Sequence, residues 1–245
     1  MVLVTGGARG VGRGISRVFR DHGAHVVTCG RSEPETAQPD FIACDVRDPD
    51  QVSAMIRRIA DERGRLDVVV NNAGGSPYVP AADASPRFSD KIVQLNLLAP
   101  LLVSQHANAL MQGQDGGGAI VMVSSVSATR PSPGTAAYGA AKAGLDNLTA
   151  SLAVEWAPKV RVNALDVGLV RTEQAHLHYG SAAGVDAVGK TVPLGRLAEP
   201  EEVGRCAAFL ASPLASYVSG ATLKVHGGGE VPAFQAAADV DREGS

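Results

Sequence analysis

The 245-residue chain carries near its start the stretch Val2-Leu3-Val4-Thr5-Gly6-Gly7-Ala8-Arg9-Gly10-Val11-Gly12. This stretch is the clearest indication of the fold. An apolar run leads into a glycine-rich turn, after which Ile15, Val18 and Phe19 recur at helical spacing. This order predicts a strand, a tight turn and a helix. Glycines let such a turn approach a pyrophosphate, whose charge is met by the N–H groups and positive dipole end of the helix. The stretch therefore predicts a dinucleotide site.

Further apolar runs follow the first one at regular intervals. We expect strands at residues 24–29, 41–44, 66–70, 119–123, 160–165 and 221–225, with helices between them. Short links between alternating strands and helices predict a doubly wound parallel sheet. We therefore expect a single-domain α/β Rossmann fold with a seven-stranded parallel sheet flanked by helices. Residues 1–229 would form the dinucleotide-binding and catalytic domain, with 230–245 as its C-terminal tail.

Composition and charge exclude several classes of function. The formal net charge is -3 and the pI is near 6.1, so no electrostatic footprint for nucleic acid or a membrane surface is expected. Cys29, Cys44 and Cys206 lack metal-type spacing, so we expect structural, reduced thiols and no bound metal. The sequence has no signal-peptide pattern and no run of about 18 apolar residues. The expected location is the cytoplasm.

The end of the second predicted strand bears on cofactor choice. An acidic residue there would accept hydrogen bonds from the ribose 2′-hydroxyl of NAD and repel the 2′-phosphate of NADP. Gly30 and Arg31 occupy that place, and Arg9 lies in the glycine turn. Because arginine suits a phosphate, we expect NADP(H) rather than NAD(H), unless both arginines are merely solvated. Asp45 could accept from an adenine amino group or cap the helix beginning near Pro49.

A second motif joins Ser125, Tyr138 and Lys142. Tyr138 and Lys142 are four residues apart in an alanine-rich segment, so they share one face of a helix. A nearby cation lowers the pKa of a phenol from its usual value of about 10, which makes Tyr138 a candidate general acid and base. Taken alone, the pattern also occurs on solvated helix faces. Asn96, in an apolar segment interrupted by Pro100, is either a satisfied core residue or a functional one.

Six ordered motifs together resemble the short-chain dehydrogenase/reductase family, in its 3-oxoacyl-carrier-protein-reductase-like branch. The motifs are the glycine turn, Asn71-Asn72-Ala73-Gly74, Asn96, Ser125, Tyr138 and Lys142, and the resemblance runs from Met1 to about Gly229. It implies an NADP(H)-dependent oxidoreductase that interconverts a carbonyl and a secondary alcohol, and an assembly of four or two copies. The alternatives are a non-catalytic NADP(H)-binding regulatory protein on the same fold and an NAD-dependent family member.

The resemblance also implies a role for each motif residue. Tyr138 would donate and accept the proton, Lys142 would lower its pKa, and Ser125 would orient the substrate oxygen. Asn96 would anchor a proton-relaying chain of waters. The implied cofactor contacts are Gly6, Arg9, Gly10, Val11, Gly12, Arg31, Asp45, Val46, Asn72, Ala73, Gly74, Tyr138, Lys142, Gly168, Val170 and Thr172.

The chain departs from the family pattern in two places. Val167-Gly168 follows the sixth predicted strand where the family usually has Pro-Gly, and Asp166 precedes it. His226 stands where an aspartate is common, and we expect it to be structural or at a subunit interface. The substrate pocket is expected from residues 75–80, 127–133 and 171–193, which show no cluster dictating a charged ligand, and the substrate is expected to be a small carbonyl or alcohol.

Overall fold

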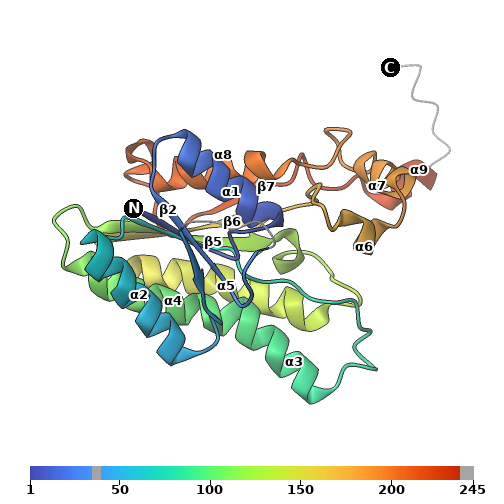
Figure 1. Cartoon of the computed structure of the whole chain (residues 1–245). Helices are drawn as coiled ribbons and strands as arrows, with labels where there is room; N and C mark the ends of the chain where they lie inside the picture. The colour runs from blue at the N-terminus through green and yellow to red at the C-terminus, as the bar shows by residue number, and fades with distance from the viewer. Residues whose placement is uncertain (35–39, 238–245) are drawn as a thin grey trace.

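The computed structural model describes residues 1–34 and 40–237 and shows a parallel sheet with helices on both faces (Figure 1). The sheet has seven strands in the order β3-β2-β1-β4-β5-β6-β7, and every neighbouring pair is parallel. The predicted single-domain, doubly wound α/β fold is confirmed. Of the predicted tail, α9 (Ala233–Ala237) is seen, whereas 238–245 lie outside the described residues.

The strands lie close to the predicted positions, and β5 and β6 run further than expected. Their bounds are β1 Val2–Thr5, β2 Val26–Gly30, β3 Phe41–Ala43, β4 Val68–Asn71, β5 Gly118–Ser125, β6 Val160–Val167 and β7 Thr222–Val225. The longer helices are α1 Gly10–Asp21, α2 Pro49–Arg63, α3 Pro86–Val93, α4 Ala99–Gln112, α5 Ala136–Glu155 and α8 Pro200–Ala211.

Two hydrophobic layers hold the helices to the sheet. On one face α2, α4 and α5 bury side chains such as Met55, Met111 and Leu145, whereas α1 and α8 cover the other face with Ile15 and Leu210 (Figure 1). Successive strand residues point to opposite faces, so each strand contributes to both layers. The strand order reverses between β1 and β4, and the crevice at the carboxyl ends of these strands is where open α/β sheets bind ligands.

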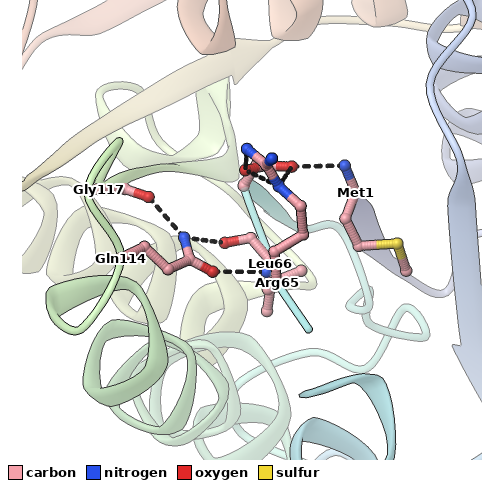
Figure 2. Close-up of polar contacts among 6 residues, drawn as sticks. Met1, Arg65, Leu66, Gln114 and Gly117 are labelled. Atoms are coloured by element: carbon pink, nitrogen blue, oxygen red, sulfur yellow. Dashed lines mark hydrogen bonds and ion pairs between the residues drawn. The ribbon is translucent and has the colours of Figure 1, made fainter. Parts of the chain in front are cut away.

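At the opposite end of the sheet, polar contacts fix the start of β4 (Figure 2). The Met1 ammonium group lies 2.6 Å from the Asp67 carboxylate, which also pairs with Arg65 at 2.6 Å. The Gln114 side chain accepts from the Leu66 N–H at 2.7 Å and donates to the Leu66 carbonyl at 3.0 Å. These bonds satisfy the main-chain groups just before β4 and hold this end of the strand.

Two segments differ from the sequence prediction. The segment 171–193, expected only as part of the substrate pocket, contains two short helices, α6 (Ala175–Tyr179) and α7 (Ala182–Gly189), which pack together through Ala175, Val185 and Leu197. The predicted helix interrupted at Pro100 is continuous through a π-helical turn, Gln94–Leu98, which joins α3 to α4. Pro100 lies just after this turn, at the start of α4, and supplies no N–H to the helical ladder there.

Candidate active site

The glycine turn and the end of β4 are tied together by the side chain of Asn72. Its Nδ2 donates to the carbonyls of Thr5 at 3.0 Å and Gly6 at 3.3 Å. A Cβ atom on Gly12 would lie 2.2 Å from the Gly6 carbonyl oxygen, closer than any real contact. The backbone of the turn is therefore folded too tightly for a side chain at position 12, as a turn that approaches a phosphate requires.

Thr5 is a site residue that the sequence analysis missed. Its hydroxyl oxygen accepts hydrogen bonds from the N–H groups of Asn72 and Ala73, both at 3.0 Å. Thr5 is buried at the end of β1, where a hydroxyl can satisfy the two amides that leave β4. Asn71 has a similar structural task, because its Nδ2 donates to the Ser104 hydroxyl at 2.8 Å. Both residues stabilise the place between β1 and β4 where the strand order of the sheet reverses.

The N-terminus of α1 already holds an anionic group of the chain itself. The Gly10 N–H donates to Oε1 of Glu173 at 2.9 Å, and Arg13 lies 3.6 Å from the other carboxylate oxygen. Burial works to raise the pKa of Glu173, but main-chain hydrogen bonds, with Arg13 and Arg9 nearby, hold it below its usual range. This helix end therefore attracts an anion, and the residues present fit the phosphate of a dinucleotide.

The groups near the end of β2 differ in part from the predicted adenine site. Arg9 and Arg31 are both exposed, and Arg31 lies near Asp45. The Asp45 carboxylate is held by Arg47 at 2.6 and 2.9 Å, and this hydrogen bonding lowers its pKa. The capping alternative for Asp45 is wrong, because Asp48 caps α2.

Val46 has a buried side chain. It packs in the hydrophobic layer that contains α2. The predicted contact of Val46 with an adenine stays a prediction. Sequence alone did not reveal this burial, because an apolar residue after a strand can face either side.

Ser125, Tyr138 and Lys142 lie together at the carboxyl end of β5 and the start of α5. Ser125 is the last residue of β5, and its hydroxyl lies near enough to Tyr138 to lower the pKa of the phenol. The Lys142 ammonium nitrogen lies 5.6 Å from the centre of the Tyr138 ring and donates to the Val123 carbonyl at 2.7 Å. The four-residue spacing does place both side chains on one face of α5, as predicted.

The pKa of Tyr138 departs from the expected direction. Burial raises it above the usual value, and the hydrogen bond from Ser125 offsets this only in part. The expected lowering by Lys142 is not seen, because the ammonium group lies over the ring and bonds to Val123. Burial lowers the pKa of Lys142 to about 8. In this state a neutral phenol stands beside a cation, which suits Tyr138 to proton donation.

Asn96 is fully buried in the π-helical turn and its side-chain amide is fully engaged. Its Oδ1 accepts from the Gly75 N–H at 2.8 Å, and its Nδ2 donates to the carbonyls of Gly75 and Ile92. A Cβ on Gly74 would lie 2.7 Å from that Oδ1 and 3.5 Å from the Lys142 ammonium. Gly74 therefore lets Asn96 approach Lys142. π-Helical turns are frequent at functional sites. The predicted proton relay through Asn96 stays a prediction.

The end of β6 closes the other side of the crevice. Val167 pairs with Ser125 on β5 and with Val225 on β7, so β6 continues through this position. The proline that the family usually has here would supply no N–H to the sheet. A Cβ on Gly168 would lie 2.8 Å from that of His226, which explains the glycine. Val170 bridges to Ala198. Thr172 lies beside Gly10. A Cβ atom added to Gly10 would be 3.7 Å from the methyl group of Thr172.

A family profile described as enoyl-(acyl carrier protein) reductase matches residues 6–230 of this chain. The chain belongs to the short-chain dehydrogenase/reductase family. It lies in the 3-oxoacyl-carrier-protein-reductase-like branch. Members of this family bind nicotinamide cofactors and act on hydroxyl or carbonyl groups, and the glycine turn at α1 fits such a cofactor.

Curated members of this family cover nearly the whole chain. The chain is 37% identical to oxidoreductase UcpA of Escherichia coli O157:H7, with 94% of each protein covered. It is 37% identical to a 3alpha-hydroxysteroid dehydrogenase of Mediterraneibacter gnavus and 39% identical to a cis-4-hydroxycyclohexanecarboxylate dehydrogenase of Sinomonas cyclohexanicum, and each alignment covers 93% of this chain and 95% of the relative.

Solved structures of the family agree with the observed fold. Ligand-free aldohexose dehydrogenase of Thermoplasma acidophilum superposes with a TM-score of 0.87 at 33% identity, covering 98% of this chain and 96% of that one. The NADP-bound structure of ElxO gives a TM-score of 0.84 at 30% identity, with 93% and 97% covered. In the described part of our chain, no helix is long and apolar enough to cross a membrane.

Proposed function

We propose that this protein is an NADP(H)-dependent oxidoreductase that interconverts a carbonyl and a secondary alcohol, with Tyr138 as the proton donor and acceptor. The observation that carries the proposal is the convergence of Ser125, Tyr138 and Lys142 beside the glycine turn. Ser125 lies near enough to Tyr138 to lower the pKa of its phenol, and the Lys142 ammonium lies 5.6 Å from the Tyr138 ring. When bound, the nicotinamide supplies or accepts the hydride.

The three side chains have distinct tasks in this proposal. Ser125 donates a hydrogen bond to the substrate oxygen and holds it beside Tyr138. In reduction, Tyr138 transfers its proton to that oxygen, and in oxidation it takes the proton back. The neutral phenol favoured by burial is the form that reduction requires. Lys142 stabilises the phenolate that proton transfer leaves behind, because its charge lies over the same ring.

Replacing Tyr138 by phenylalanine tests this assignment. A Tyr138→Phe enzyme should bind NADPH as the parent does and lose about 10²- to 10⁴-fold in turnover on any accepted carbonyl. Tyr217→Phe is the matched control, because Tyr217 is fully exposed. Turnover retained in Tyr138→Phe would refute the proton-transfer role. NADPH binding by the parent without oxidation in the presence of any ketone, sugar, steroid or thioester would instead indicate a non-catalytic binding protein.

The NADP(H) preference rests on charge at the end of β2. Arg31 is an exposed cation there, Arg9 is an exposed cation in the glycine turn, and the Asp45 carboxylate near Arg31 is paired with Arg47. ElxO, a structural relative, binds NADP. Arg31→Ala should weaken NADPH binding about tenfold or more, because a charge-assisted hydrogen bond contributes about 1.5–3 kcal/mol. NADH lacks the 2′-phosphate, so its binding should stay nearly unchanged. Arg57→Ala, an exposed arginine on α2, is the control. A parent enzyme that prefers NADH would contradict the assignment.

We also propose that the protein assembles as a homotetramer or homodimer. Large apolar side chains are exposed on the described surface, among them Val154 on α5 and Leu214 and Tyr217 before β7. Where such side chains lie together they mark an association surface, and the proposal takes these as part of one. This proposal draws on the resemblance to family members that pair through their long helices.

A further inference from the structure

A buried pair of carboxyl groups lies directly below the Tyr138–Lys142 site. Asp146 follows Lys142 by one turn of α5, and Asp166 lies on β6 opposite Ser124 of β5. Asp166 is 1% exposed, and Asp146 is partly buried. Strand periodicity agrees with this placement, because Met122 and Ala164, two residues before Ser124 and Asp166, pack in the layer that contains α5.

The pair lacks the donors that two ionised carboxylates would need. In the part of the chain that the structure describes, neither oxygen of Asp166 nor Oδ1 of Asp146 has a hydrogen-bond partner. Ser124 lies near enough to both carboxyls to lower their pKa values, but its hydroxyl has only one proton and donates to the Lys142 carbonyl at 3.4 Å. A proton held between the two carboxyls would give each carboxyl one hydrogen-bond partner.

The electrostatic environment of the pair favours such a shared proton. Burial, and then the adjacent Asp166, raise the pKa of Asp146 to about 6. Burial also raises the pKa of Asp166, against the influence of Ser124 and of Lys224, its neighbour on β7. Two close carboxyls titrate as a unit. The unit therefore holds a proton to a higher pH than an isolated carboxyl does, and loses it as the pH rises through about 6.

Lys142 is the cation that faces this unit. Its ammonium group is 3% exposed, donates to the Val123 carbonyl, and forms no ion pair with any described carboxylate. Burial lowers its pKa to about 8, and the charge of Asp146 acts in the opposite direction. A buried ammonium that must stay charged needs negative charge nearby. On α5, β5, β6 and β7, the groups facing the pair are Lys142, Ser124 and Lys224.

We propose that Asp146 and Asp166 are positioning residues for the reaction: as a proton-sharing pair beneath Lys142, they supply the negative charge that keeps its ammonium group protonated beside Tyr138. This inference rests on the proposed role of Lys142 in the reaction. Asp146 is the member nearer to Lys142, and Asp166 controls the charge on Asp146. The two residues therefore affect Lys142 differently when each is replaced.

The direct test is the pKa of Lys142 in the ligand-free protein, followed by the Cε resonance in carbon-13 NMR. The lysines are Lys91, Lys142, Lys159, Lys190 and Lys224, and Lys142→Arg assigns the signal by its loss. Asp146→Asn should lower the pKa of Lys142 by about 0.5–1 pH unit, because one partly screened charge is removed. Asp166→Asn should lower it less, because Asp146 stays ionised. Glu155→Gln, an exposed acid on the same helix, should change nothing.

A second readout detects the shared proton itself. Infrared difference spectra of the parent should show a protonated carboxyl that is lost as the pH rises through about 6, and both asparagine variants should lack it. In turnover, the alkaline limb of the pH profile of kcat/KM should shift to lower pH in Asp146→Asn, by the same amount as the Lys142 pKa. In Asp146→Glu the limb should return to its parental position.

Two results would overturn the proposal: an unchanged Lys142 pKa in folded Asp146→Asn, or no protonated carboxyl in the parent at about pH 5. The infrared result decides even where a variant fails to fold. Because the lysine titration needs no substrate, it also stands when no carbonyl is turned over. Failure of the pair and failure of the oxidoreductase proposal are therefore separate outcomes.

Discussion

Gly12 shows how one missing side chain shapes the dinucleotide turn. A Cβ at this position would meet the Gly6 carbonyl oxygen at 2.2 Å and Asn72 Nδ2 at 2.5 Å. The carbonyl belongs to backbone and the amide is fixed by two hydrogen bonds, so neither can move away freely. We therefore expect Gly12→Ala to force the turn open. Overpacking of this kind costs about 1–3 kcal/mol or more.

The expected outcome is a loss of stability together with weaker NADPH binding, measured by urea unfolding and by fluorescence titration. Gly116→Ala is the matched control, because a Cβ at Gly116 meets nothing within 4 Å. Gly12→Ala with parental stability and affinity would show that the turn is more adaptable than the contacts imply.

At the scale of single elements, helix α8 depends on an ion pair at its first turn. Arg196 holds the Glu202 carboxylate at 2.7 and 2.8 Å, and the Glu199 N–H donates to the same carboxylate at 2.8 Å. The Arg196 hydrogen bonds, and then the Glu199 N–H, lower the pKa of Glu202 to about 2. A lowered folded-state pKa gives stability that is present above the unfolded pKa of about 4.3 and is lost as the pH falls toward 2.

Glu202→Gln should therefore reduce the free energy of unfolding by about 1–2 kcal/mol at pH 7. This figure already allows for screening of the ion pair by solvent. The deficit should narrow steadily below about pH 4, where the parent loses the same charge. Urea unfolding across this range checks it. Glu201→Gln is the control in the same turn, because Glu201 has only a 3.6 Å pair with Arg17. Equal losses in both variants at every pH would contradict the assignment.

The segment after β6 makes a second prediction at this scale. Glu173 places its carboxylate on the Gly10 N–H, at the helix end where an anionic cofactor is expected. Removing that negative charge should raise the affinity for NADPH about two- to fivefold, since a charge at a helix terminus is worth about 0.3–1 kcal/mol. Calorimetric titration of Glu173→Gln measures this.

Asp186→Asn, which removes an exposed acid from α7, controls for net charge. Unchanged or weaker NADPH binding in Glu173→Gln, with Asp186→Asn like the parent, would mean that Glu173 does not compete with the cofactor.

Strands, turns and helices that depend on neighbouring residues could be predicted from the sequence. Contacts and pKa shifts that depend on residues distant in the chain could not. The strand, turn and helix from Val2 to Asp21 follow from apolar spacing and glycines, and the Tyr138–Lys142 face follows from a four-residue step. The Glu173 contact joins residues 163 positions apart, so no local pattern indicates it. The raised pKa of Tyr138 depends on burial, which only the packed structure reveals.

At the scale of the whole molecule, the parallel topology assembles the site from four strand ends. Thr5 ends β1, Asn71 ends β4, Ser125 ends β5 and Val167 ends β6. Each strand end carries residues that the sequence separates by dozens of positions. Sequence patterns predicted this common edge because buried parallel strands are near-continuous apolar runs.

The proposed assembly gives a further prediction at this scale. Val154 is 81% exposed on α5, the helix that carries Tyr138 and Lys142. In sedimentation, the parent should behave as a dimer or tetramer, and Val154→Lys should yield smaller species without loss of monomer stability, because a charge in an apolar interface is costly. Ser151→Lys, also exposed on α5, controls for the added charge. A monomeric parent would refute the assembly.

In the proposed reaction, hydride passes between the nicotinamide and a substrate carbon beside Tyr138. The most direct measurement supplies NADPH deuterated at C4 of the nicotinamide with each member of a broad carbonyl panel, and analyses the products by mass spectrometry. We expect an alcohol that carries one deuterium on the former carbonyl carbon, formed by the parent and not by Tyr138→Phe. NADPH consumed with no deuterium on any product carbon would contradict the proposal.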